Sequence, residues 1–107
     1  MAWIVLGIAG LLEVVWAYFM KASDGFSKPL PSIITIVAMI ASFGLLAWSM
    51  KTLPLGTAYT IWTGIGAVGA FVVGVTVLGE SLSIWRVVAA ILIVSGLVVM
   101  KLASPAH

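Results

Sequence analysis

Four long apolar runs, separated by short polar connectors, constrain this chain more than any other feature. The runs cover Ala2–Met20, Ser32–Met50, Thr57–Leu78 and Ile84–Met100. Each is close to the ~20 residues that cross the hydrocarbon of a bilayer as a helix. Because no water is present there to satisfy the backbone, the runs are expected to be helical throughout. The pattern predicts an all-α membrane protein, with four transmembrane helices in one transmembrane domain over residues 1–107.

The composition argues against a soluble fold. Of the 107 residues, 64% are hydrophobic and 7% are charged, whereas soluble domains have about 45–50% apolar and about 25% charged residues. Eight charged side chains cannot cover the surface of a soluble domain. The net charge of +2 is too small to indicate binding to nucleic acid. Since the chain has no cysteine, a disulfide and a thiolate metal site are both excluded.

The connectors and the first run agree with a multi-pass protein of the cell (inner or plasma) membrane. The first run lacks a positively charged start and has a carboxylate in its middle, so it does not fit a cleaved signal peptide. Asp24-Gly25 is typical of a turn, and Ser83 is expected to cap the last helix. All four prolines are expected outside the helices, where they break no hydrogen bond: Pro29, Pro31, Pro54 and Pro105.

The cations divide about evenly between the two membrane faces. Four spans put both termini on one side, where the positive amino terminus joins Lys51 and Lys101, and the other side has Lys21, Lys28 and Arg86, about three cations against three. Since an excess of Lys and Arg on one side normally sets the orientation, neither orientation is favoured. Either one boundary is misplaced or one cation dominates, or copies insert both ways and pair head to tail. Such a pair would form the inverted repeat that many transporters carry within one chain.

Glu13 is the only ionisable residue deep inside a run, at the twelfth of the nineteen positions of Ala2–Met20. A charged group at mid-bilayer costs about 2.5–3.5 kcal/mol, so a residue of this kind is a candidate functional site. The alternative is a protonated Glu13 that bonds a neighbouring helix. In a pair of copies, two Glu13 carboxyl groups would hold protons. An entering cation would displace these protons, because protons and cations compete for the same carboxylate oxygens. With no second carboxylate, His or Cys in the runs, no metal site is expected.

Gly10 and Trp16 lie one turn on either side of Glu13, on the same helical face. Gly10 is expected to leave space there. Trp16 and Trp62 lie too deep for the interfacial belt in which tryptophan is common. An aromatic face near a carboxylate attracts cations, and ordinary packing is the alternative for both rings.

Two further candidates lie on the second and third runs. Tyr59 shares a helical face with Trp62, Thr63 and Gly66, although its position near a run's end equally fits the interfacial belt. Ser42, midway along the second run, is expected either to bond its own backbone or to orient Glu13. The fourth run has no polar residue in its interior except Ser95, which favours a role in assembly over one in a pathway.

Several segments resemble the small multidrug resistance transporters, and the resemblance extends over nearly the whole chain. Within that family, Trp16 and the run Gly56–Ala67 resemble the guanidinium-exporter branch, since the multidrug branch typically has a small residue in place of Trp16. The resembling segments are Leu12-Glu13-Val14-Val15-Trp16, Met20–Phe26, Ser42-Phe43 and Pro54–Gly66.

The resemblance implies an antiparallel, dual-topology homodimer that works by alternating access. It also implies that Glu13 binds substrate and protons, with Trp16, Ser42, Tyr59 and Trp62 around the substrate. We therefore expect a proton-coupled antiporter that exports guanidinium and small guanidinyl cations, with no cofactor and no enzyme chemistry. Export of bulkier quaternary ammonium ions is the first alternative. A non-transporting assembly partner, with Glu13 as a structural group, is the second.

Overall fold

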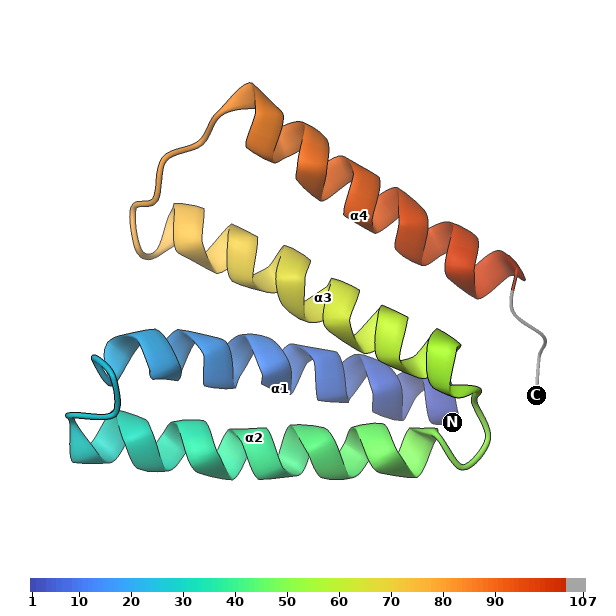
Figure 1. The fold of residues 1–107 in the computed structure, drawn as a ribbon, viewed down its shortest axis with the longest axis horizontal. Coiled ribbons are helices and arrows are strands. Elements are labelled where there is room, and N and C mark those ends of the chain that lie inside the picture. Colours follow the sequence, from blue (N-terminus) through green and yellow to red (C-terminus); the bar gives the residue numbers. More distant parts are fainter. Residues whose placement is uncertain (104–107) are drawn as a thin grey trace.

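The computed structural model describes residues 1–103 as four helices (Figure 1). They are α1 (Ala2–Ala22), α2 (Pro29–Ser49), α3 (Leu55–Thr76) and α4 (Ile84–Ala103). Each helix is long and apolar enough to cross a membrane, and no strand occurs within residues 1–103. The predicted all-α architecture with four spans is confirmed. The remainder of the predicted domain, residues 104–107, lies outside the described residues.

The ends of the helices differ from the predicted runs by a few residues. α2 begins at Pro29, three residues before the predicted start, so Pro29 and Pro31 lie inside its first turn and the prediction that they lie outside was wrong. The first N–H groups of a helix have no partner within it, so proline breaks no hydrogen bond there. α1 continues through Lys21, whose positive charge is favourable at a helix C-terminus.

The connectors form the local structures that their residues predict. Asp24, Gly25 and Phe26 have φ angles of 50°, 73° and 67°, which confirms the turn between α1 and α2. At the start of α4, the Arg86 N–H donates to the Ser83 hydroxyl at 3.3 Å, as expected for an N-cap serine.

Helices that follow one another in the chain are antiparallel, and α1 lies between α2 and α3, running parallel to α3 (Figure 1). At the level of the backbone, α4 contacts only α3. The first residues of α1, the last residues of α4 and the α2–α3 connector lie at one end of the molecule, and the other two connectors lie at the opposite end. This arrangement agrees with the two groups of cations identified in the sequence.

The buried core lies where α1, α2 and α3 meet. α1 contributes Leu6 and Ala9, and the fully buried Ser42 lies in the same region on α2. None of the described residues of α4 is buried. The hydrophobic residues buried in this core are Leu6, Ala9, Leu46, Leu53, Ala58, Ile61 and Trp62.

Candidate functional site: a carboxyl between the first and third helices

Glu13 projects from α1 toward α3, where its side chain lies against the bare backbone of Gly66. A β-carbon built at Gly66 would overlap the Glu13 carboxyl group, so this place exists only because residue 66 has no side chain. The Oε1 atom of Glu13 is buried and has no hydrogen-bond partner within the described part of the chain. The site therefore presents an unpaired acceptor in the interior of the helical bundle.

Trp16, one turn farther along α1, presents an unpaired donor. Its Nε1 atom is buried and also has no hydrogen-bond partner in residues 1–103. An unpaired buried polar group costs about 1–3 kcal/mol, so such groups call for a ligand, a water molecule or another chain. Here an acceptor and a donor of this kind lie three residues apart on the same helix, Glu13 and Trp16.

Ser42 joins the three core helices through two hydrogen bonds. The Trp62 Nε1–H donates to the Ser42 hydroxyl at 3.0 Å, and that hydroxyl donates to the carbonyl of Ala9 on α1 at 2.7 Å. The sequence led us to expect that the Ser42 hydroxyl bonds either the backbone of its own helix or Glu13. It donates its proton to neither of them. The network instead holds α1 against α2 and α3, one turn before the carboxyl-bearing residue.

Four aromatic side chains from three helices form a connected series that begins at Trp16, one turn from Glu13. Trp16 packs edge-on against Phe43, with ring centroids 6.2 Å apart. Phe43 and Trp62 are tilted, with centroids 5.6 Å apart, and Trp62 and Tyr59 are separated by the same distance. Phe43 was not predicted as a site residue. Its place beside Ser42, in a pair that resembles the small multidrug resistance transporters, was the available signal.

The sequence predicted that Gly10 leaves open space beside the Glu13 carboxyl group, and within a single chain this prediction was wrong. A β-carbon at Gly10 would lie 2.7 Å from Cγ2 of Ile65 on α3, so the space is already filled within a single chain. Gly69 is in the same situation, since a side chain there would overlap Val14 of α1. Both glycines allow α1 and α3 to pack closely along the line on which Gly66 receives Glu13.

Tyr59 is placed differently from the other predicted residues, because its side chain reaches the outer face of the helices. Tyr59 is 52% exposed, whereas Trp62 is 6% exposed. Tyr59 and Thr63 line a cavity of about 500 Å³ between α3 and α4, and Glu13 is not among the residues around it. Within residues 1–103, no group of three His, Cys, Asp or Glu residues could hold a metal ion.

Comparisons with known proteins agree with this architecture. Residues 1–93 match the model of a family described as Small Multidrug Resistance protein. Relatives named "Guanidinium exporter" occur in Yersinia pestis (60% identity), Salmonella typhimurium strain LT2 (60%) and Escherichia coli strain K12 (57%). Each alignment covers 97% of this chain, and 100%, 99% and 99% of the respective relatives.

The family match covers α1–α3 and the first half of α4, and the alignments with the relatives cover 97% of the chain. A chain with four such helices and these relatives is a multi-pass protein of the inner membrane, and its role is transport, which is not an enzymatic one. The chain belongs to the small multidrug resistance protein family.

Proposed function

We propose that this chain exports guanidinium and small guanidinyl cations in exchange for protons, and that Glu13 binds both. The names of relatives that are 57–60% identical support the substrate. The observation that carries the site is the pair of unpaired buried atoms, Oε1 of Glu13 and Nε1 of Trp16. Among the described residues, Glu13 is also the one carboxylate within a span.

The chemistry of guanidinium fits this arrangement. The ion is planar and permanently charged, and its N–H donors lie all around its edge. Carboxylates accept two such donors in parallel, as they do from arginine, and indole faces attract cations. Because a proton and a cation compete for the same oxygens, loading one releases the other. This competition produces coupled exchange if the empty site, with its carboxylates charged, cannot switch its access from one side of the membrane to the other.

The same proposal includes an antiparallel homodimer. One chain leaves α4 without a buried residue and the Tyr59 ring half exposed, so a second copy could cover these surfaces. The even division of cations between the two ends favours insertion in both orientations. Two inverted copies would place two Glu13 carboxyls in one site near the midplane, and would make the inward-open and outward-open states equivalent.

Transport by the purified full-length chain in liposomes tests the function directly. We expect guanidinium and single-alkyl guanidines to be exchanged for protons, and tetraalkylammonium ions to be poor substrates. A tetraalkylammonium ion has no N–H donor, and each buried acceptor that it leaves unpaired costs about 1–3 kcal/mol, which corresponds to about 5- to 150-fold in affinity. Trp16→Gly should weaken guanidinium transport and reduce this discrimination.

Two outcomes would contradict the proposal in different ways. Equal or better transport of bulky ammonium ions favours a multidrug exporter and removes the argument from Trp16, while the role of Glu13 stands. No flux of any cation favours the non-transporting alternative, in which Glu13 is a structural group.

Labelling a single cysteine tests the dual topology. The chain has no native cysteine, and Thr52, in the α2–α3 connector, is exposed. We expect Thr52→Cys to react with an impermeant thiol reagent from both sides of the membrane in cells. Reaction from one side only would contradict the antiparallel homodimer.

A further inference from the structure

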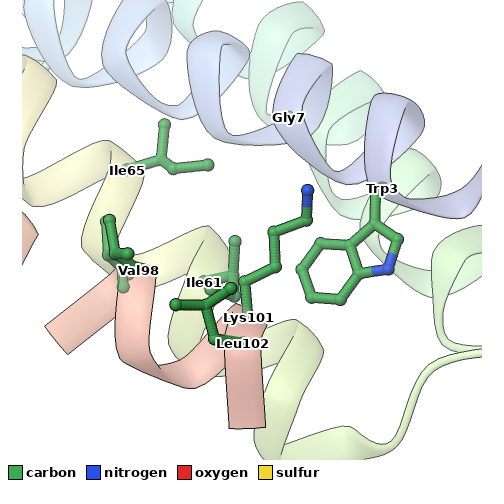
Figure 2. Close-up of a pocket in the computed structure, with 8 residues that line it drawn as sticks. Trp3, Gly7, Ile61, Ile65, Val98, Lys101 and Leu102 are labelled. Atoms are coloured by element: carbon green, nitrogen blue, oxygen red, sulfur yellow. The ribbon is translucent and has the colours of Figure 1, made fainter. Parts of the chain in front are cut away.

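A second cavity, which Glu13 does not line, lies at the junction of α1, α3 and α4. It encloses about 340 Å³, and its walls are apolar except at one end. Figure 2 shows the Lys101 side chain running from α4 toward α1, where it ends beside Trp3 and near Gly7. The Lys101 ammonium lies 5.3 Å from the centroid of the Trp3 ring.

This groove lies on the opposite side of the α3–α4 pair from the cavity that Tyr59 and Thr63 line. On α3, Ile61 and Ile65 line the groove. Successive residues of a helix point about 100° apart around its axis. On this basis, Ile61 and Ile65 point about 150° away from the mean direction of the α3 residues that line the other cavity, which are Tyr59, Thr60, Thr63, Gly64 and Ala67. A second copy that covers the Tyr59 face therefore leaves the groove facing the lipid.

At the outer end of the groove, the Lys101 ammonium forms no ion pair with any residue that the structure describes. Within residues 1–103, the ion pair is Arg86 with Glu80, which lies at the opposite end of the molecule from Lys101 (Figure 1). Trp3 and Lys101 lie near helix ends that share one membrane face, the level at which tryptophan and lysine side chains meet lipid headgroups. From there, Ile61 and Ile65 extend the apolar wall inward by one turn, about 5.4 Å.

We propose that this groove binds one anionic glycerophospholipid, with its phosphate on the Lys101 ammonium and an acyl chain along Ile61 and Ile65. The charge selects an anion, and the apolar wall selects a chain that continues into the bilayer; inorganic phosphate has no such chain. On α1, the groove is bounded by Gly7, which has no side chain to fill it. The space beside Gly7 is open, since a β-carbon built there would meet no atom within 4 Å.

The bound lipid would join α4 to the rest of the molecule. The backbone of α4 approaches only that of α3, and none of its described residues is buried. A lipid in the groove contacts α1, α3 and α4 together. This role is separate from transport, so the test measures lipid binding and needs no flux.

Native mass spectrometry of the full-length protein tests the proposal with phosphatidylglycerol and phosphatidylcholine. We expect phosphatidylglycerol to be retained in preference to phosphatidylcholine. Lys101→Gln should lower this retention about fivefold, the effect of one cation near a membrane surface, while the control Lys51→Gln should not. Equal retention of the two lipids, or equal loss in the two lysine variants, would overturn the proposal.

A second pair of variants tests the groove itself. Gly7→Leu should fill it and lower retention of the lipid, whereas Gly44→Leu should not. Gly44 is likewise a helical glycine with no atom within 4 Å of a built β-carbon, but it does not line the groove. Unchanged retention in Gly7→Leu would assign the lipid to another surface.

Two further measurements remain decisive if a variant folds poorly. In the unmodified protein, a photoreactive acyl chain on phosphatidylglycerol should label Ile61, Ile65 or Val98, and labelling confined to other segments would reject the site. In Gly7→Cys carrying a photoreactive cross-linker on the new thiol, cross-linking to a second copy and not to lipid would show that a second copy covers the groove.

Discussion

The two parts of this molecule, α1–α3 and α4, are held in different ways. The first three helices share buried polar contacts, such as the bonds from Trp62 to Ser42 and from Ser42 to the Ala9 carbonyl. They also share glycine contacts, in which Gly10 receives Ile65 and Gly66 receives Glu13. α4 has no buried residue among those described. Its contacts with α3 include Gly64, where a β-carbon would overlap Leu97.

The difference follows from the bilayer as a solvent. Lipid tails are as apolar as leucine, so apolar surface alone gives helices little reason to associate. Small residues that allow close packing, and hydrogen bonds between helices, supply the attraction instead. α1–α3 have both, and they carry the candidate site. α4 has mainly an apolar surface, which the second chain and the lipid proposed above would cover.

The largest expected effect is at Glu13. Glu13→Gln keeps the shape of the side chain but cannot release a proton, so guanidinium-driven proton movement in liposomes should fall to background while insertion is retained. Glu80→Gln is the matched control, because Glu80 lies outside the helices and its side chain is 45% exposed, and it should keep most of the activity. Undiminished coupling in Glu13→Gln would refute the mechanism.

Gly66→Ala should have the next largest effect, because the new methyl group would occupy the place of the Glu13 carboxyl group. Displacing a binding group by about 1 Å can cost on the order of 100-fold, so we expect guanidinium exchange to fall at least about tenfold. In the control Gly56→Ala, the added β-carbon meets no atom within 4 Å, and exchange should be unchanged. Equal activities of the two variants would mean that Glu13 does not depend on Gly66.

Ser42→Ala tests the polar contacts of the core. It removes the acceptor of the buried Trp62 N–H and the donor to Ala9, and should lower the free energy of unfolding by about 1–2 kcal/mol. The measurement is reversible unfolding in mixed micelles. Ser32→Ala serves as the control, because that hydroxyl bonds only the Lys28 carbonyl nearby in the chain, and its removal should change stability by far less.

The smallest effect is expected at the start of α4. Arg86 and Glu80 form an ion pair at 3.3 Å, but their side chains are 37% and 45% exposed. Exposed pairs contribute about 0–1 kcal/mol, so Arg86→Gln should lower the free energy of unfolding by less than about 1 kcal/mol, and added salt should reduce the difference. A loss as large as that of Ser42→Ala would show that α4 is held as firmly as the core helices.

The amino-acid sequence by itself determined the class of the protein and its central candidate residue. Apolar runs of bilayer length predict helices whatever their neighbours are, because the backbone has no other partner in hydrocarbon. Glu13 stands out for a similarly local reason, the cost of a charge at that depth. The turn at Asp24-Gly25 and the cap at Ser83 are equally local, and the structure has both.

Only the tertiary structure decided which residues meet across helices. Helical periodicity assigns a residue to a face, but the angle and depth at which two helices cross depend on every side chain between them. For that reason Gly66, and not Gly10, lies beside the Glu13 carboxyl group, and the Ser42 hydroxyl bonds the backbone of α1. The same reason explains why Phe43 joins the aromatic series and Lys101 reaches Trp3, since each contact links segments far apart in the chain.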